Sequence, residues 1–275
     1  MSARSLSSLE SKLILHLEWE KQSVVNIEDA MKIMGVSYDH ARQLLHGLMQ
    51  DHWLARVQPG KYELIPAERG EHAFPDTNPL FLGSVLVQPY YFSYATAAFF
   101  HGLSTQASQV VFIATSQDLP RRRLVREKEY RLIFQPEHKF FGWLEMDAYG
   151  SRVNMAEPEK AVLDNLDHPA YAGDIPEVAG MLWRGRNSLK WKKIVEYAIR
   201  FRSRALLQRL GYLLEVVKIP IDPDVRRTLL EKAVAEGKCY LGQPGRWGVG
   251  GEYSATWRVV DNISRNELFS ELEVK

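Results

Sequence analysis

The first 65 residues carry a succession of short helical and extended patterns that few folds accept. Apolar side chains recur near the N-terminus at helical spacing, at Leu6, Leu9, Leu13, Ile14 and Leu17. This spacing predicts an amphipathic helix over residues 6–19. The β-branched pair Val24–Val25 follows, and Asn26 has the short polar side chain that caps a helix N-terminus. We therefore expect a short extended segment and then a second helix over residues 27–34.

A glycine and a tight turn mark the element boundaries in the rest of this N-terminal segment. Gly35 is placed to end the second helix, and Ser37 to cap a third. The inner face of that third helix is apolar at Ala41, Leu44, Leu45, Leu48 and Met49. Two short strands, "WLARV" and "YELI", flank the turn residues 58–61 and predict a hairpin. This order of elements is typical of a winged helix-turn-helix, which we assign to residues 1–65.

In such a domain the third helix enters the DNA major groove, and its outward side chains read base edges. The residues that the sequence offers for DNA contact are Ser37, Tyr38, His40, Arg42, Gln43, His46, Arg56 and Lys61. Arginine and glutamine match the edges of guanine and adenine, and the two cations of the hairpin can reach phosphate. Small helical domains of this shape also serve as dimerisation or docking modules, so that alternative stays open.

The charge of this segment does not by itself indicate a polyanionic partner. The whole chain carries 35 Lys and Arg against 34 Asp and Glu, a formal net charge of +1. Residues 1–65 hold seven basic residues (Arg4, Lys12, Lys21, Lys32, Arg42, Arg56, Lys61) and eight acidic ones (Glu10, Glu18, Glu20, Glu28, Asp29, Asp39, Asp51, Glu63), a net charge of −1. DNA-binding modules usually present a basic surface. The DNA-binding interpretation therefore requires a basic face within a neutral total.

A linker and a larger domain follow. Residues 66–80 contain three prolines and no apolar periodicity, which is typical of a linker. In residues 81–275, a helix is predicted near 93–102, and the strands "QVVFIATS" and "YRLIF" enclose a basic loop with Arg121, Arg122 and Arg123. The strands "KFFGWLEM" and "SRVNM" then precede a helical section. The expected fold is α+β: a winged helix-turn-helix followed by a larger mixed α/β domain with a helical C-terminal part.

The most basic part of the chain lies in the helical section, between residues 184 and 209. Its cations include Arg184, Arg186, Lys190, Lys192, Lys193, Arg200, Arg202 and Arg204, against Glu196 as the one acidic residue. Together with the arginines at 121–123, they form a candidate second basic surface for DNA flanking the recognition site. A surface that forms salt bridges with the acidic stretch 157–177 explains the same run equally well. The glycine-rich residues 242–251 lack the Gly-Lys-Ser/Thr ending of a phosphate-binding loop and predict a hairpin loop.

The stretch "NMAEPEKAVLDNLDHPAYAGD" crowds carboxylates, a lysine and a histidine together, as an active site does. Pro158 and Glu159 suit the first turn of a helix, and Lys160 and Asp164 can form a surface pair one turn apart. A restriction-type nuclease would need an acidic-x-Lys triplet, whereas Glu159 and Lys160 are adjacent. The sequence thus predicts no catalytic residue and a protein that is not an enzyme. A metal-dependent nuclease or nucleotidyl enzyme using Glu159, Lys160 and Asp164 is the alternative.

Neither a metal nor a cofactor is expected. Cys239 is the single cysteine, which excludes an intramolecular disulfide and a multi-cysteine zinc site. Asp164 and His168 lie one helical turn apart but lack a third ligand. The chain has no uninterrupted apolar run of about 18 residues and no signal-peptide pattern, so we expect a cytoplasmic protein without a membrane partner.

Several segments together resemble the AbiEi antitoxin family of bacterial type IV toxin–antitoxin systems. They are "YYFSYATAAFFHGL" (90–103), "VVFIAT" (110–115), "KFFG" (139–142), "PEKAVLD" (158–164) and "RLGYLLE" (209–215). The resemblance extends over residues 8–262 and includes a preceding winged helix-turn-helix.

The resemblance implies a transcriptional autorepressor whose N-terminal domain binds double-stranded DNA repeats in its own promoter. It also implies a functional partner, a nucleotidyltransferase-like toxin, which the larger domain helps to neutralise without needing a stable complex. No catalytic residue comes with the resemblance. A module that binds a toxin protein directly remains a further alternative.

Overall fold

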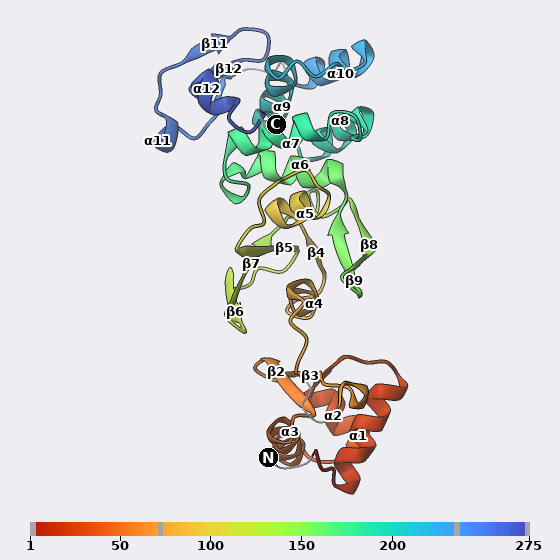
Figure 1. The fold of residues 1–275 in the computed structure, drawn as a ribbon. Coiled ribbons are helices and arrows are strands. Elements are labelled where there is room, and N and C mark those ends of the chain that lie inside the picture. Colours follow the sequence, from red (N-terminus) through yellow and green to blue (C-terminus); the bar gives the residue numbers. More distant parts are fainter. Residues whose placement is uncertain (1–3, 71–73, 234–236, 273–275) are drawn as a thin grey trace. The chain divides into compact units, whose positions relative to one another are not determined.

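The computed structural model describes residues 4–70, 74–233 and 237–272. The chain divides into two compact units: unit 1 is residues 1–88 with 124–128, and unit 2 is residues 89–123 with 129–275. Helices and three sheets make up the described residues, so the fold is α+β, as predicted (Figure 1). No helix among the described residues is long and apolar enough to cross a membrane.

Unit 1 contains the predicted winged helix-turn-helix. Its elements are α1 (Ser8–Trp19), β1 (Val24–Asn26), α2 (Ile27–Met34), α3 (Tyr38–Gln50), β2 (Leu54–Gln58) and β3 (Lys61–Leu64), followed by η1 (Ala67–Arg69) and α4 (Pro79–Ser84). The strands form one antiparallel sheet in the order β1-β3-β2. Three helices and a hairpin therefore follow one another as the sequence patterns predict.

Local capping explains where these helices begin and end. The Ser7 hydroxyl accepts a hydrogen bond from the Glu10 amide, and the Glu10 carboxylate accepts one from the Ser7 amide. This capping box starts α1 at Ser8, two residues later than the sequence pattern indicated. Asn26 Oδ1 accepts a hydrogen bond from the Asp29 amide at 2.7 Å and caps α2. Gly35 ends α2 with a φ of 73°, a conformation that suits glycine.

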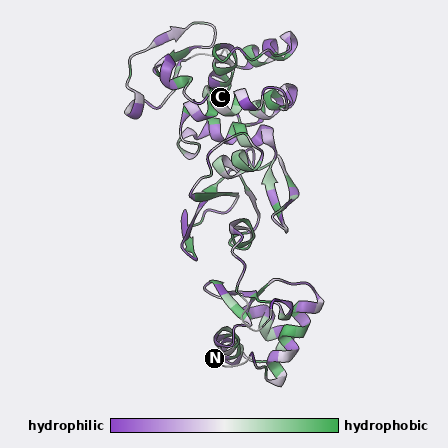
Figure 2. Cartoon of the chain, viewed as in Figure 1, coloured by the Kyte–Doolittle hydropathy of each residue, from purple (hydrophilic) through white to green (hydrophobic). Residues whose placement is uncertain are grey.

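One small hydrophobic core holds unit 1 together. Hydrophobic residues run along α1 (Figure 2), and Leu13, Ile14 and Leu17 are buried. They pack with Leu45 and Leu48 of α3. Leu6 and Leu9, which the sequence placed in the same stripe, are only partly buried.

The largest sheet, most of which lies in unit 2, is mixed and has six strands in the order β6-β7-β5-β4-β9-β8. The strands are β4 (Tyr90–Phe92), β5 (Val110–Thr115), β6 (Arg122–Val125), β7 (Lys128–Phe134), β8 (Trp143–Ala148) and β9 (Ser151–Ala156). Helix α5 (Tyr94–Phe100) follows β4 in the chain. The pairs β5–β7 and β4–β9 are parallel, and β4–β5 and β8–β9 are antiparallel. The segment predicted as a basic loop is in fact edge strand β6, because it pairs with β7.

Helices follow the sheet, as the sequence predicts. They are α6 (Pro158–Asp167), η2 (Pro169–Tyr171), α7 (Ile175–Arg184), α8 (Trp191–Arg200), α9 (Arg204–Val216) and α10 (Pro223–Ala233). A small sheet, β10 (Cys239–Tyr240), β11 (Glu252–Ser254) and β12 (Val259–Asp261), and the short helices α11 (Pro244–Trp247) and α12 (Arg265–Leu268) complete the unit. The glycine-rich segment is not a hairpin loop, because β10 and β11 each pair with β12 rather than with each other.

Lys160 and Asp164 lie one turn apart in α6, as expected, but the pair is not on the surface. Neither side chain has any exposed area. Lys160 Nζ donates to Asp164 Oδ1 and, at 2.9 Å, to Tyr91 Oη, while Ser93 Oγ donates to Asp164 Oδ2. Burial lowers the pKa of Lys160 and raises that of Asp164, and their mutual attraction opposes both shifts. The surface prediction was wrong because the groups that bury the pair lie some 70 residues earlier in the chain.

Removing one member of this buried pair should destabilise the fold more than removing both. Lys160→Met leaves the Asp164 carboxylate without its cation in the core, and we expect a loss of about 3–5 kcal/mol in the free energy of unfolding. The double variant Lys160→Met/Asp164→Leu should lose less, because no uncompensated charge remains. Chemical denaturation followed by circular dichroism measures both losses.

The control is Arg152→Ala, which breaks the exposed ion pair with Glu145 and should cost less than about 1 kcal/mol. A double variant as unstable as Lys160→Met alone would contradict a role for the unpaired charge.

Candidate nucleic-acid interface

Helix α3 separates an apolar face from a polar face. Ala41, Leu45 and Leu48 are buried in the core of unit 1. The opposite face is exposed at Asp39, Arg42, Gln43, His46 and Gln50. Their spacing of three and four residues places these side chains in one stripe along the helix. Tyr38, which is 51% exposed, and His40 lie at the N-terminal end of this face.

Two side chains of the exposed stripe offer hydrogen-bonding groups that are not used within the described chain. Neither the Arg42 nor the Gln43 side chain makes a hydrogen bond or ion pair with another described residue. His46 and Gln50 lie one turn apart, with 3.3 Å between their Nε2 atoms. Ser37 occupies the N-cap position, but its hydroxyl caps no backbone amide. The first-turn amides of α3 are therefore open to an external acceptor.

The two cations of the hairpin differ in their surroundings. Arg56 in β2 is exposed. Lys61 at the start of β3 is half-buried, and its Nζ donates to the Val85 carbonyl at 2.8 Å. Burial lowers the pKa of Lys61. The sequence predicted phosphate contact for both residues. Arg56 is available for such a contact, whereas the Lys61 ammonium is used in a hydrogen bond within unit 1.

Arg4 is another cation of unit 1 that serves the fold. Its guanidinium donates to the carbonyls of Ile65 and Gly70 and stacks on the Trp53 ring at 3.8 Å. The cations of residues 1–65 that remain exposed are Lys12, Lys21, Lys32, Arg42 and Arg56. The exposed positive charge of residues 1–65 is therefore modest, and α3 contributes one arginine to it.

In the basic run at residues 184–209, two cations form salt bridges with the acidic stretch 157–177, as one of the two interpretations of the sequence requires. Arg184 pairs with Glu177 at 2.6 Å. Lys193 pairs with Glu157 at 2.6 Å and lies 3.6 Å from Glu159. Burial favours the neutral form of Glu157, but hydrogen bonds from Lys193 and Tyr197 outweigh it and lower the pKa of Glu157.

Most of the other cations of the run are exposed to solvent. Arg186 is half-buried and stacks on Trp183 at 4.0 Å. The exposed members are Lys190, Lys192, Arg200, Arg202 and Arg204, and Arg200 also covers the Phe141 ring at 3.9 Å. At the edge strand β6, Arg121 and Arg122 are exposed and Arg123 is half-buried. The run therefore divides between a structural set and an exposed set.

The residues of the nuclease alternative are not presented to a substrate. Lys160 and Asp164 have no exposed area, and Glu159 is 4% exposed. Glu159 Oε1 accepts the Lys190 amide at 3.1 Å, which links α6 to the start of α8. Within the described ranges, no group of three His, Cys, Asp or Glu side chains is arranged to hold a metal ion. The acidic density of this segment is explained by its packing.

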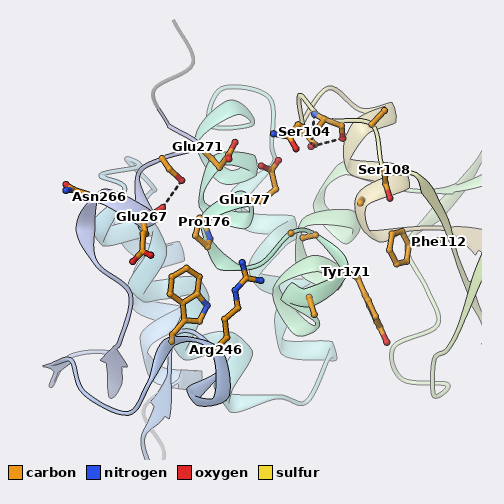
Figure 3. Close-up of a pocket in the computed structure, with 18 residues that line it drawn as sticks. Ser104, Ser108, Phe112, Tyr171, Pro176, Glu177, Arg246, Asn266, Glu267 and Glu271 are labelled. Carbon is orange, nitrogen blue, oxygen red and sulfur yellow. Dashed lines mark hydrogen bonds between the residues drawn. The ribbon is translucent and has the colours of Figure 1, made fainter.

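Unit 2 also contains a cavity of about 620 Å³ that the sequence did not predict (Figure 3). Side chains from α7, α11, α12 and the segment after α5 line it, among them Ser104, Glu177, Arg246 and Glu271. Burial raises the pKa of Glu177, while Ser104 and Arg184 stabilise its charged form. Arg246 pairs at 3.2 Å with Asp174, which also accepts a hydrogen bond from Trp247 Nε1. These ion pairs and hydrogen bonds join segments that are distant in the sequence, so no local sequence pattern predicts the cavity.

Comparisons with known proteins inform the fold. No family profile matches the chain, and no curated protein matches it. Among solved structures, it is similar to the crystal structure of the RV2827C protein from Mycobacterium tuberculosis, with a TM-score of 0.66 and 18% sequence identity. The match covers 98% of this chain and 96% of that one, so the two proteins share their fold over nearly their whole length.

Proposed function

We propose that this protein is a DNA-binding antitoxin of a type IV toxin–antitoxin system and represses its own operon. The observation that carries the DNA-binding part is the polar face of α3, which is exposed and rich in hydrogen-bond donors, and on which the Arg42 and Gln43 side chains have no partner among the described residues. A winged helix-turn-helix places this helix in the major groove.

Each part of unit 1 then has a distinct role. Arg42 would bind the O6 and N7 atoms of guanine, and Gln43 the N6 and N7 atoms of adenine. The open amides at the start of α3 and the exposed guanidinium of Arg56 would bind phosphate, which fixes the register of the helix on DNA. The exposed cations of unit 2, Lys190 to Arg204, would bind phosphates that flank the recognition site.

The antitoxin part rests on the resemblance of segments 90–103, 110–115, 139–142, 158–164 and 209–215 to AbiEi antitoxins. That resemblance implies that the partner in function is a nucleotidyltransferase-like toxin, with the DNA repeats of its own promoter as the physical ligand. The proposed function requires no catalytic group, cofactor or metal. The burial of Lys160 and Asp164 favours it over the nuclease alternative.

Substitutions in α3 should weaken specific DNA binding. Arg42→Ala and Gln43→Ala should each cost about 1–3 kcal/mol on the promoter region upstream of the gene and relax the base preference at one position. Arg56→Ala should weaken binding to promoter and scrambled DNA alike and reduce the salt slope by about 1, because a phosphate contact carries no sequence information. Fluorescence anisotropy over a range of salt concentrations measures all three effects.

Lys232→Ala, an exposed cation on α10, is the control and should leave promoter affinity unchanged. Unchanged affinity in both α3 variants would refute the assignment of α3 as the recognition helix.

The second basic surface makes its own prediction for the salt dependence. Replacing Lys190, Lys192, Arg200 and Arg202 by Gln should lower the salt slope of DNA binding by up to about 0.9 for each phosphate that the variant no longer neutralises. The matched control replaces Lys218, Arg226, Arg227 and Lys232, four exposed cations of α10 and the turn that precedes it. Equal slopes for the two quadruple variants would show that the run does not bind DNA.

The antitoxin activity is tested apart from DNA binding. Cells that express the nucleotidyltransferase-like product of a neighbouring gene should regain growth when this chain is co-expressed from an unrelated promoter. The Arg42→Ala variant should restore growth equally well, because neutralisation is assigned to the larger domain. Failure of both proteins to restore growth would remove the antitoxin part and leave a DNA-binding repressor.

A further inference from the structure

Helix α1 carries the largest exposed apolar side chain of unit 1. Trp19 is 84% exposed, and Leu15, one turn earlier, is 64% exposed. Residues four apart on a helix are neighbours, so the two side chains form one contiguous patch. Isolated apolar residues are common on protein surfaces, but a contiguous patch with a tryptophan is typical of an interface.

The patch belongs to a longer exposed seam along α1. Ser8, Lys12, Leu15 and Trp19 are all exposed, and their successive spacings are four, three and four residues. This is the spacing with which one helix packs along another. The seam spans about 17 Å, and its side chains are small or polar at the N-terminal end and large and apolar at the C-terminal end.

We propose that this seam, Ser8–Lys12–Leu15–Trp19, joins two copies of the chain through an antiparallel pairing of their α1 helices. A two-fold axis through the middle of the seam sets Trp19 of one copy over the small Ser8 of the other. The same axis sets Leu15 against the aliphatic stem of Lys12. A large side chain then meets a small one at both ends of the interface, as an isologous contact requires.

The charges along α1 select the antiparallel direction. Lys12 lies in the N-terminal half, where the Glu10 carboxylate accepts the Ser7 amide. Glu20 directly follows the last residue of α1, and Glu18 Oε1 before it accepts the Ala67 amide. Antiparallel pairing brings the Lys12 ammonium toward the Trp19 ring and the Glu20 carboxylate of the other copy, where cation–π and ionic attraction add. Parallel pairing would instead place each charged residue beside the same residue of the other copy, so that like charges meet. It would also align the two helix dipoles in one direction. Neither Lys12 nor Glu20 has an ion-pair partner among the residues described, so both are available for this contact.

The association does not rest on the proposed function, because it needs no DNA. Sedimentation equilibrium of the full chain without DNA should show a monomer–dimer equilibrium in the micromolar range. Trp19→Lys and Leu15→Lys should each raise the dimer dissociation constant at least tenfold and leave the circular dichroism spectrum and thermal midpoint unchanged, since both side chains are outside the core. Val249→Lys, which places the same charge on a 70% exposed apolar residue of unit 2, is the matched control and should dimerise normally.

The direction of pairing is measured with a spin label at Glu20→Cys in a Cys239→Ser background. Antiparallel helices place the two labels about 20 Å or more apart, and parallel helices place them about 10 Å apart. A chain that stays monomeric throughout the micromolar range would overturn the proposal, and so would a dimer that survives Trp19→Lys. A dimer with the short label distance would overturn the antiparallel seam. A dimer that Trp19→Lys dissociates and that shows the long distance establishes it.

Discussion

The buried pair of Lys160 and Asp164 fixes the junction between the sheet and the helices of unit 2. Its hydrogen bonds to Tyr91 and Ser93 connect α6 to β4 and to the start of α5. The Lys160 ammonium also lies 4.7 Å from the Phe201 ring, just after α8. A charge without exposed area is tolerated only where its partners are in place, so each neighbour must adopt one position. The pair thus specifies how the central strands meet the helices, at a cost in desolvation that an apolar core would avoid.

The winged helix-turn-helix could be predicted from the sequence because its signals are local. Asn26, Gly35 and the turn at residues 58–61 act within a few residues of themselves, and the structure places an element boundary at each. Unit 2 was less predictable because long-range contacts decide it. Edge strand β6 exists through pairing with β7, and no sequence pattern tells a basic loop from a basic edge strand. The polar partners that bury Lys160 likewise come from a different part of the sheet.

The candidate interface shows the same division between local and distant causes. Helical periodicity alone predicts that Arg42, Gln43 and His46 face outward, and these side chains are exposed. Periodicity cannot predict that Val85 captures Lys61, nor which cations of the run at 184–209 form salt bridges. That run could be explained as a DNA-binding surface or as a set of salt bridges. The salt-bridge explanation applies to Arg184 and Lys193. The exposed members carry the proposal that DNA is bound there.

The modest charge of unit 1 constrains the DNA binding that we propose for it. Since Arg4 and Lys61 serve the fold, one exposed arginine on α3 and few other cations face solvent. Non-specific affinity depends on the number of phosphates neutralised, so a unit with few exposed cations binds random DNA weakly. Affinity for an operator would then come from base contacts and from several weak DNA-binding surfaces linked in one molecule. The proposed second basic surface and the proposed pairing of α1 would each supply such a joined contact, because linking two binding modules raises the effective concentration of the second. Under the proposed function, a unit of nearly neutral charge would thereby remain selective against bulk DNA and still bind two adjacent sites tightly.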